Sequence, residues 1–82
     1  HHKNDNMGKY SQLRKITQVF SEYGIVLTGA RKHDHFIFDL RMDKISLNWL
    51  IFELEYALNI ELDDHKVMNV DAPSQLIALL LD

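Results

Sequence analysis

The stretch FIFDLRMDKISLNWL, residues 36–50, decides how this chain folds. It runs from an apolar triplet to Asp43, a residue that can cap a helix by accepting hydrogen bonds from free backbone amides. The segment that follows, KISLNWLIFELEYALN, predicts a helix ending near Asn59. At about 100° per residue, this helix has two apolar sides. One consists of Leu47, Leu50, Ile51, Leu54 and Leu58, and the opposite one of Ile45, Trp49, Phe52 and Tyr56.

A first helix is predicted before this stretch. Apolar residues recur at three- and four-residue spacing from Lys9 to Tyr23, which is typical of an amphipathic helix, and Gly24 supplies a stop. Residues 25–42 then form a long connection. Its IVL and FIF segments could be short strands, but helices on both sides favour a loop that packs its apolar residues onto a bundle. The stripe of the first helix consists of Leu13, Ile16, Val19, Phe20 and Tyr23.

Two more helical segments follow the two-sided helix. Residues 63–68 predict one short helical turn. Asp71 can cap a last helix in which Pro73 occupies the tolerant first turn. We expect Leu76, Ile77 and Leu80 of this helix to face the core. The predicted fold class is therefore all-α, with three longer helices and a short third one.

Composition limits the class of protein. The 82 residues suffice for one domain, and 46% hydrophobic with 26% charged residues predicts a folded chain. The absence of Cys excludes disulfides and thiolate sites, and a net charge of −3 argues against nucleic-acid binding. The longest apolar run, LIALLL at 76–81, is far below the roughly 20 residues that span a membrane, so we expect a cytoplasmic protein. Residues 1–6 are interpreted as a tag or disordered N-terminus, and residues 7–82 as the domain.

The segment FIFDLRMDKISL resembles a stretch of acyl carrier proteins. In that family the stretch reads Phe, two variable residues, Asp-Leu, two more, then Asp-Ser-Leu at the start of the second helix. Phe36, Asp39, Leu40 and Asp43 match it here, and ELEYALNIEL and VDAPSQLIALL continue the likeness at fixed register. The resemblance implies a small acyl-carrier-like four-helix bundle with a long loop between helices 1 and 2 and a short third helix.

The chain departs from the family at its central residue. The family's Ser carries 4′-phosphopantetheine on its hydroxyl, whereas Lys44 offers an amine and no hydroxyl oxygen. Ser46 is a fallback, but two helical residues turn a side chain by roughly 200° and advance it about 3 Å, so we favour an ordinary first-turn residue. We predict no cofactor. The alternative is a working thioester carrier modified at Ser46, or at position 44 if Lys44 replaces a natural Ser.

The resemblance also implies a partner-binding side on the second helix, where the family presents acids to basic enzyme surfaces. Ser46, Trp49 and Tyr56 stand where the family would often show an acid, which indicates aromatic burial in place of electrostatic steering. A second interpretation is equally open, in which the 25–42 loop folds over this side as a core wall. The predicted partner-binding residues are Asp43, Lys44, Ile45, Trp49, Phe52, Glu55 and Tyr56.

Other groups of polar residues predict no catalytic or metal site. His33, Asp34 and His35 lack a third and fourth metal ligand apart from distant His65. The acids Glu53, Glu55, Glu61, Asp63 and Asp64 indicate a solvated face, and no Ser-His-Asp order or P-loop is present. We therefore expect no enzyme. The leading hypothesis is a scaffold or regulatory module of a lipid or natural-product pathway that binds a protein or itself through the second helix; a generic helical adaptor is a third possibility.

Overall fold

The computed structural model describes residues 2–81, with side chains described for 8–28 and 31–81. No strand occurs within residues 2–81, so the all-α prediction is confirmed and neither IVL nor FIF forms a strand. The first helix begins at His2, earlier than the predicted start at Lys9. The elements are α1 (His2–Glu22), the 3₁₀ helix η1 (Gly29–His33), α2 (Lys44–Leu58), α3 (Asp64–Val67) and α4 (Pro73–Leu81).

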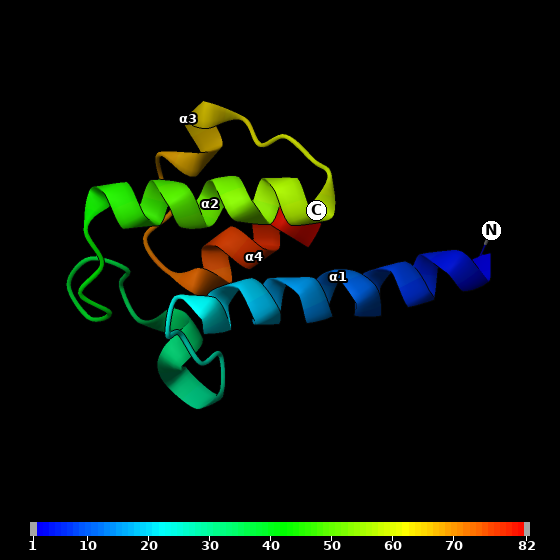
Figure 1. Ribbon diagram of the computed structural model, residues 1–82, viewed down its shortest axis with the longest axis horizontal. Helices are drawn as coiled ribbons and strands as arrows, with labels where there is room; N and C mark the ends of the chain where they lie inside the picture. Colours follow the sequence, from blue (N-terminus) through cyan, green and yellow to red (C-terminus); the bar gives the residue numbers. More distant parts are fainter. Residues whose placement is uncertain (1, 82) are drawn as a thin grey trace.

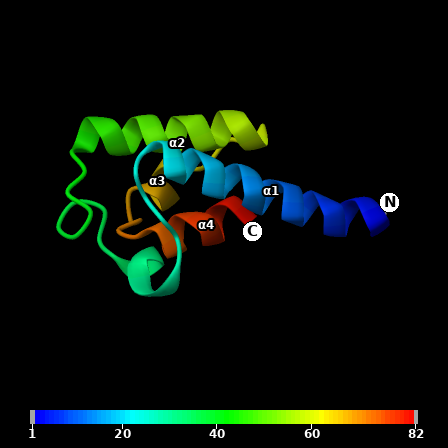
Figure 2. The same cartoon turned by 60° about the horizontal axis from the view of Figure 1, so that its bottom comes forward.

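The three longer helices pack side by side around one core. α1 contacts both α2 and α4. α1 and α2 run antiparallel, and α4 runs in the direction of α2 (Figure 1). The long connection and η1 lie at the end of the bundle where α2 begins, while the first turns of α1 extend beyond the other helices (Figure 2). One long side of α2 faces away from α1 and α4 (Figure 2).

The core draws on all three longer helices and on the connection. Phe20 of α1 and Phe36 of the connection are fully buried, and their rings stack with centroids 6.3 Å apart. Leu13 was predicted to join the stripe of α1 but stays 41% exposed, because it lies on the open side of that helix. The buried residues that form the core cluster are Ile16, Val19, Phe20, Ile25, Phe36, Leu50, Ile51, Leu54, Leu58, Leu76 and Leu80.

The connection is held to the bundle by backbone hydrogen bonds. Gly24 adopts a left-handed φ of 77°, and the next amide, that of Ile25, donates to the Phe20 carbonyl at 2.9 Å, which closes α1 as predicted. Phe36 donates its amide to the Asp71 carbonyl at 2.7 Å, and its own carbonyl accepts from Met42 at 2.9 Å. Ile25 and Phe36 of the connection therefore pack onto the bundle, whereas Val26 and Phe38 stay exposed. No signal in the sequence predicted η1.

The helix caps decide where α2 and α4 begin. Asp43 caps α2 as predicted, and Asn59 ends it with a left-handed φ of 55°. The predicted cap of α4 is wrong, because the helix begins at Pro73 and Asp71 stands one position too early. The side chain of Gln75 reaches back instead and accepts from the amides of Asp71 and Ala72 at 2.5 and 3.2 Å.

Candidate functional site on α2

The N-terminus of α2 holds the residues at which the family resemblance breaks down. The Asp43 carboxylate accepts a hydrogen bond from the Ser46 amide at 2.6 Å. Hydrogen bonds from Ser46 lower the pKa of Asp43, because they favour its ionised form. Lys44 is the first residue of the helix and is exposed. Its ammonium is a donor without acceptor capacity, so this position presents a cation and no hydroxyl.

Ser46 belongs to the first turn and supports the cap. It is half-buried, and its backbone amide is the group that Asp43 satisfies. Ser46 and Lys44 lie two residues apart on a regular helix, so their side chains leave α2 in directions roughly 200° apart. The backbone amide of Ser46 thus takes part in the N-terminal cap of α2.

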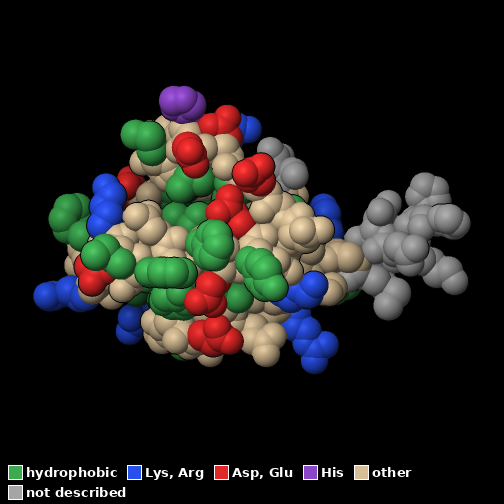
Figure 3. Space-filling model, turned by 45° about the horizontal axis from the view of Figure 1, so that its top comes forward, with side chains coloured by type: hydrophobic (Ala, Val, Ile, Leu, Met, Phe, Trp, Pro, Cys, Tyr) green, Lys and Arg blue, Asp and Glu red, His purple; other side chains and the backbone are tan. Residues whose placement is uncertain are grey.

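The outward side of α2 carries four large hydrophobic side chains, which we name the α2 stripe: Ile45, Trp49, Phe52 and Tyr56. Their exposed fractions are 69%, 57%, 58% and 83%, respectively. Trp49 and Phe52 contact each other edge to face, with ring centroids 6.0 Å apart and planes at 85°. Figure 3 shows exposed hydrophobic side chains in a row across this face, with acidic side chains beside them. Isolated exposed hydrophobic residues are ordinary, but a contiguous row marks an interaction surface.

Two open depressions flank Phe52 along the stripe. One, of about 450 Å³, is lined by Ile45, Asn48, Trp49 and Phe52. The other, of about 440 Å³, is lined by residues of the C-terminal half of α2 and of the chain after it. The aromatic rings therefore protrude between depressions, a surface shape that can interdigitate with the side chains of another protein.

The long connection does not cover the α2 stripe. It turns inward through Phe36, which is fully buried, and its neighbour Phe38 is 75% exposed. The sequence left open whether the stripe was an exposed face or a second core wall. The exposed fractions decide for the exposed face, because a core wall would bring its rings close to full burial.

The acids next to the stripe have structural partners. Glu53 accepts a hydrogen bond from the Tyr23 hydroxyl at 2.8 Å, which joins α1 to α2. Burial and the neighbouring Glu53 carboxylate raise the pKa of Tyr23 to about 12. Glu55, a predicted partner-binding residue, accepts from the Leu62 amide at 2.7 Å and is half-buried. Its carboxylate therefore orders the chain after α2 while its charge stays at the rim of the stripe.

The HDH segment, residues 33–35, has a structural role in the loop that was not predicted from the sequence. Nδ1 of His35 accepts hydrogen bonds from the amides of Ile37 and Phe38, at 3.1 and 3.2 Å. Nε2 of His35 lies 3.5 Å from a carboxylate oxygen of Asp71. Within the described residues no three His, Cys, Asp or Glu side chains are grouped so that they could hold a metal ion. His35 thus fixes the turn between η1 and α2.

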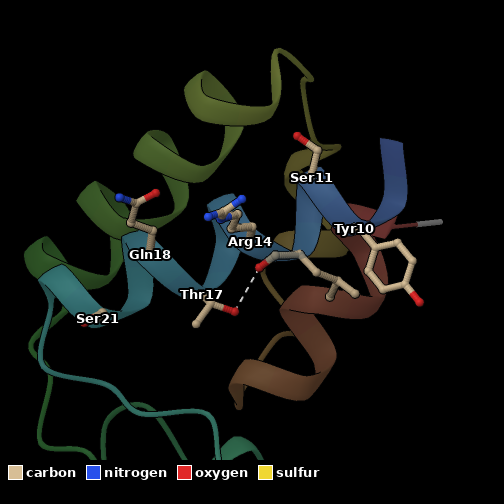
Figure 4. A pocket seen from close by; sticks show the side chains of 7 residues that line it. Tyr10, Ser11, Arg14, Thr17, Gln18 and Ser21 are labelled. Atoms are coloured by element: carbon tan, nitrogen blue, oxygen red, sulfur yellow. Dashed lines mark hydrogen bonds between the residues drawn. The ribbon is translucent and has the colours of Figure 1, made fainter. Parts of the chain in front are cut away.

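A broader depression of about 940 Å³ follows one side of α1 and was not predicted. Its lining residues include Tyr10, Arg14 and Gln18, and all of them come from this single helix (Figure 4). The Thr17 hydroxyl is already used, because it donates to the Leu13 carbonyl at 2.8 Å. With no second element opposite, polar groups do not converge on a common ligand.

Comparison with known proteins gave no match to a family model, to a curated protein or to a solved structure. No helix in the described part of the chain has the length and apolar character needed to cross a membrane.

Proposed function

We propose that this chain is an acyl-carrier-protein-like domain without the phosphopantetheine arm, acting as a protein-interaction or scaffold module in a lipid or natural-product pathway. The observation that carries the interaction role is the open α2 stripe. Three of its four members are aromatic, the residue class that dominates binding energy at interfaces. The pathway label rests on the family resemblance of residues 36–81 alone.

The arrangement of helices supports the carrier-like part of the proposal. A long first helix, a long connection, a second helix capped by Asp43, a short third helix and a final helix follow one another in the order that the resemblance implies. Lys44 occupies the first position of α2, where the family carries its Ser. A carrier with a thiol arm needs a hydroxyl at this site, whereas a domain that works by surface contact does not.

A mass measurement tests the missing arm. The purified chain is incubated with coenzyme A and a broad-specificity phosphopantetheinyl transferase, and its intact mass is recorded. We expect no change in mass. A gain of one phosphopantetheine that disappears in Ser46→Ala would establish the working-carrier alternative and overturn the proposal.

The variant Lys44→Ser provides the matched positive control. It restores the Asp-Ser motif at residues 43–44 on an exposed helix start, so we expect it to gain one phosphopantetheine under the same conditions. Failure of a folded Lys44→Ser variant to accept the arm would contradict the carrier-like part and favour a generic helical adaptor.

A further inference from the structure

The spacing of the α2 stripe reads the same in both directions. Its members, Ile45, Trp49, Phe52 and Tyr56, are separated by four, three and four residues. This is the alternation of the a and d positions in a coiled-coil seam. A two-fold axis between Trp49 and Phe52 maps the stripe onto itself when a second helix lies antiparallel. The stripe is thus self-complementary in register.

We propose that a second copy of this chain docks on the α2 stripe, with the two α2 helices antiparallel. The inference rests on the proposed function and names its partner. In this pairing Ile45 of each copy faces Tyr56 of the other, and Trp49 faces Phe52. The depression beside Trp49 and Phe52 receives the rings of the second copy. Each large ring meets another large apolar side chain, and none is left opposite a charge.

Charge along the stripe selects the antiparallel direction. At its N-terminal end the charges of Asp39, Arg41, Asp43 and Lys44 cancel, and Lys44 is the cation on the first turn of α2. The charged residues of its C-terminal half are carboxylates, those of Glu53, Glu55 and Glu61. An antiparallel copy brings Lys44 of each chain toward the acidic end of the other, and it also opposes the two helix dipoles favourably. A parallel copy would place six carboxylates together.

The exposed area of the stripe limits the size of the interface that it can form. The exposed parts of its four side chains together amount to roughly 500 Å² on each copy, and the dimer would bury this area. A standard interface buries about 800 Å² per partner, so this one belongs to the small, reversible class. We therefore expect a dimer that forms in the micromolar to near-millimolar range and dissociates on dilution.

Sedimentation velocity over that concentration range tests the dimer. We expect the sedimentation coefficient to rise with concentration, and Trp49→Ala to weaken association at least about tenfold. Tyr10→Ala is the matched control, because Tyr10 is also an exposed aromatic residue, at 77%, but lies on α1. A chain that stays monomeric throughout, or a dimer that Tyr10→Ala weakens as much as Trp49→Ala, overturns the proposal.

Charge reversal tests the direction without touching the rings. Lys44→Glu adds a carboxylate to the N-terminal end of the stripe, so we expect weaker association. The same change suits the local helix dipole and should leave folding intact. Adding Glu61→Lys to this variant restores opposite charges at the two ends and should restore association. Unchanged association in Lys44→Glu would contradict the charge argument.

Thiol cross-linking tests the register, because the native chain contains no Cys. Under oxidation, Ile45→Cys mixed with Tyr56→Cys should give a disulfide-linked dimer, while neither variant alone should. In the antiparallel pair, identical positions 45 lie about 16 Å apart, beyond the reach of a disulfide. Efficient cross-linking of Ile45→Cys with itself would indicate a parallel dimer and overturn the proposal. The mass test of the missing arm is independent, so failure of either idea is visible by itself.

Discussion

The two apolar sides of α2 have similar hydrophobic character but opposite environments. Leu50 and Leu54 on the inner side are fully buried, whereas Phe52 between them is 58% exposed. α2 packs against α1, and the large side chains of its outer side stay more than half exposed. The apolar residues of α2 thus predict that the helix packs into the core, but they do not predict which of its two sides is buried. The exposed side is the one available for binding.

The largest expected effect on stability is the difference between substitutions on the inner side and on the outer side of α2. Leu54→Ala removes a fully buried side chain and should lower the free energy of unfolding by about 3 kcal/mol, through lost apolar contact and a cavity. Phe52→Ala, two residues away, should lower it by less than about 1 kcal/mol. Urea unfolding monitored by circular dichroism measures both. Equal losses would show that the outer rings belong to the core.

A smaller effect is expected at the contact between α1 and α2. Tyr23→Phe removes the hydrogen bond to Glu53 and should cost about 1 kcal/mol of unfolding free energy. The pKa of Tyr23, raised from 10.0 to about 12, adds a pH signature. Its folded-state pKa lies above the unfolded one, so its stabilisation is complete below pH 10 and is lost as the pH rises toward 12.

Alkaline unfolding measurements check this prediction. Between pH 10 and 12 the native chain should lose more stability than Tyr23→Phe does, which isolates this phenol from the other titrating groups. Ultraviolet absorbance of the phenolate should show a tyrosine ionisation near pH 12 that is absent from Tyr23→Phe. Identical alkaline profiles for the two proteins would contradict a stabilising contact with Glu53.

A third, smaller effect concerns the cap of α2. Hydrogen bonds from Ser46 hold the pKa of Asp43 below its usual value, so its contribution to stability is present above the unfolded pKa and is lost as the pH falls through the folded pKa. Asp43→Asn keeps a capping oxygen and should change the melting temperature little near neutral pH. Its melting temperature should then fall less than that of the native chain on acidification. Parallel acid profiles would exclude this role for Asp43.

The smallest effect on stability is expected at Tyr56, the most exposed member of the stripe at 83%. Tyr56→Ala should change the unfolding free energy by no more than about 0.5 kcal/mol, because few contacts are lost within the chain. The same variant should weaken self-association measurably. Stability lost together with association would mean that the ring packs within its own chain.

Much of the helical order follows from local signals in the sequence. Gly24 ends α1 and Asp43 begins α2 because each satisfies backbone groups within a few residues of itself, so no distant contact is needed. The cap of α4 is also local, but it uses a different residue: the side-chain oxygen of Gln75 reaches back to the amides of Asp71 and Ala72. An Asp71 cap would instead accept from the amides two or three residues after it, and Pro73 has no N–H to offer.

The candidate site could be located but not interpreted from sequence. Helical spacing predicted that Ile45, Trp49, Phe52 and Tyr56 share one side of α2, and it could not tell whether residues 25–42 cover that side. The roles of Glu55 and His35 were also hidden, since their hydrogen-bond partners depend on how the loops turn. Only the folded chain shows which acids remain at the rim of the stripe.

From the sequence follow an all-α chain, the end of α1, both ends of α2, the two apolar sides of α2 and an amine where a carrier would need a hydroxyl. These features depend on covalent chemistry and on backbone groups a few residues apart. The tertiary structure alone decided that Phe36 fills the core and that the α2 stripe stays open. Burial depends on contacts between segments that are distant in sequence, and Phe36 of the connection packs against Phe20 and not over the outer side of α2.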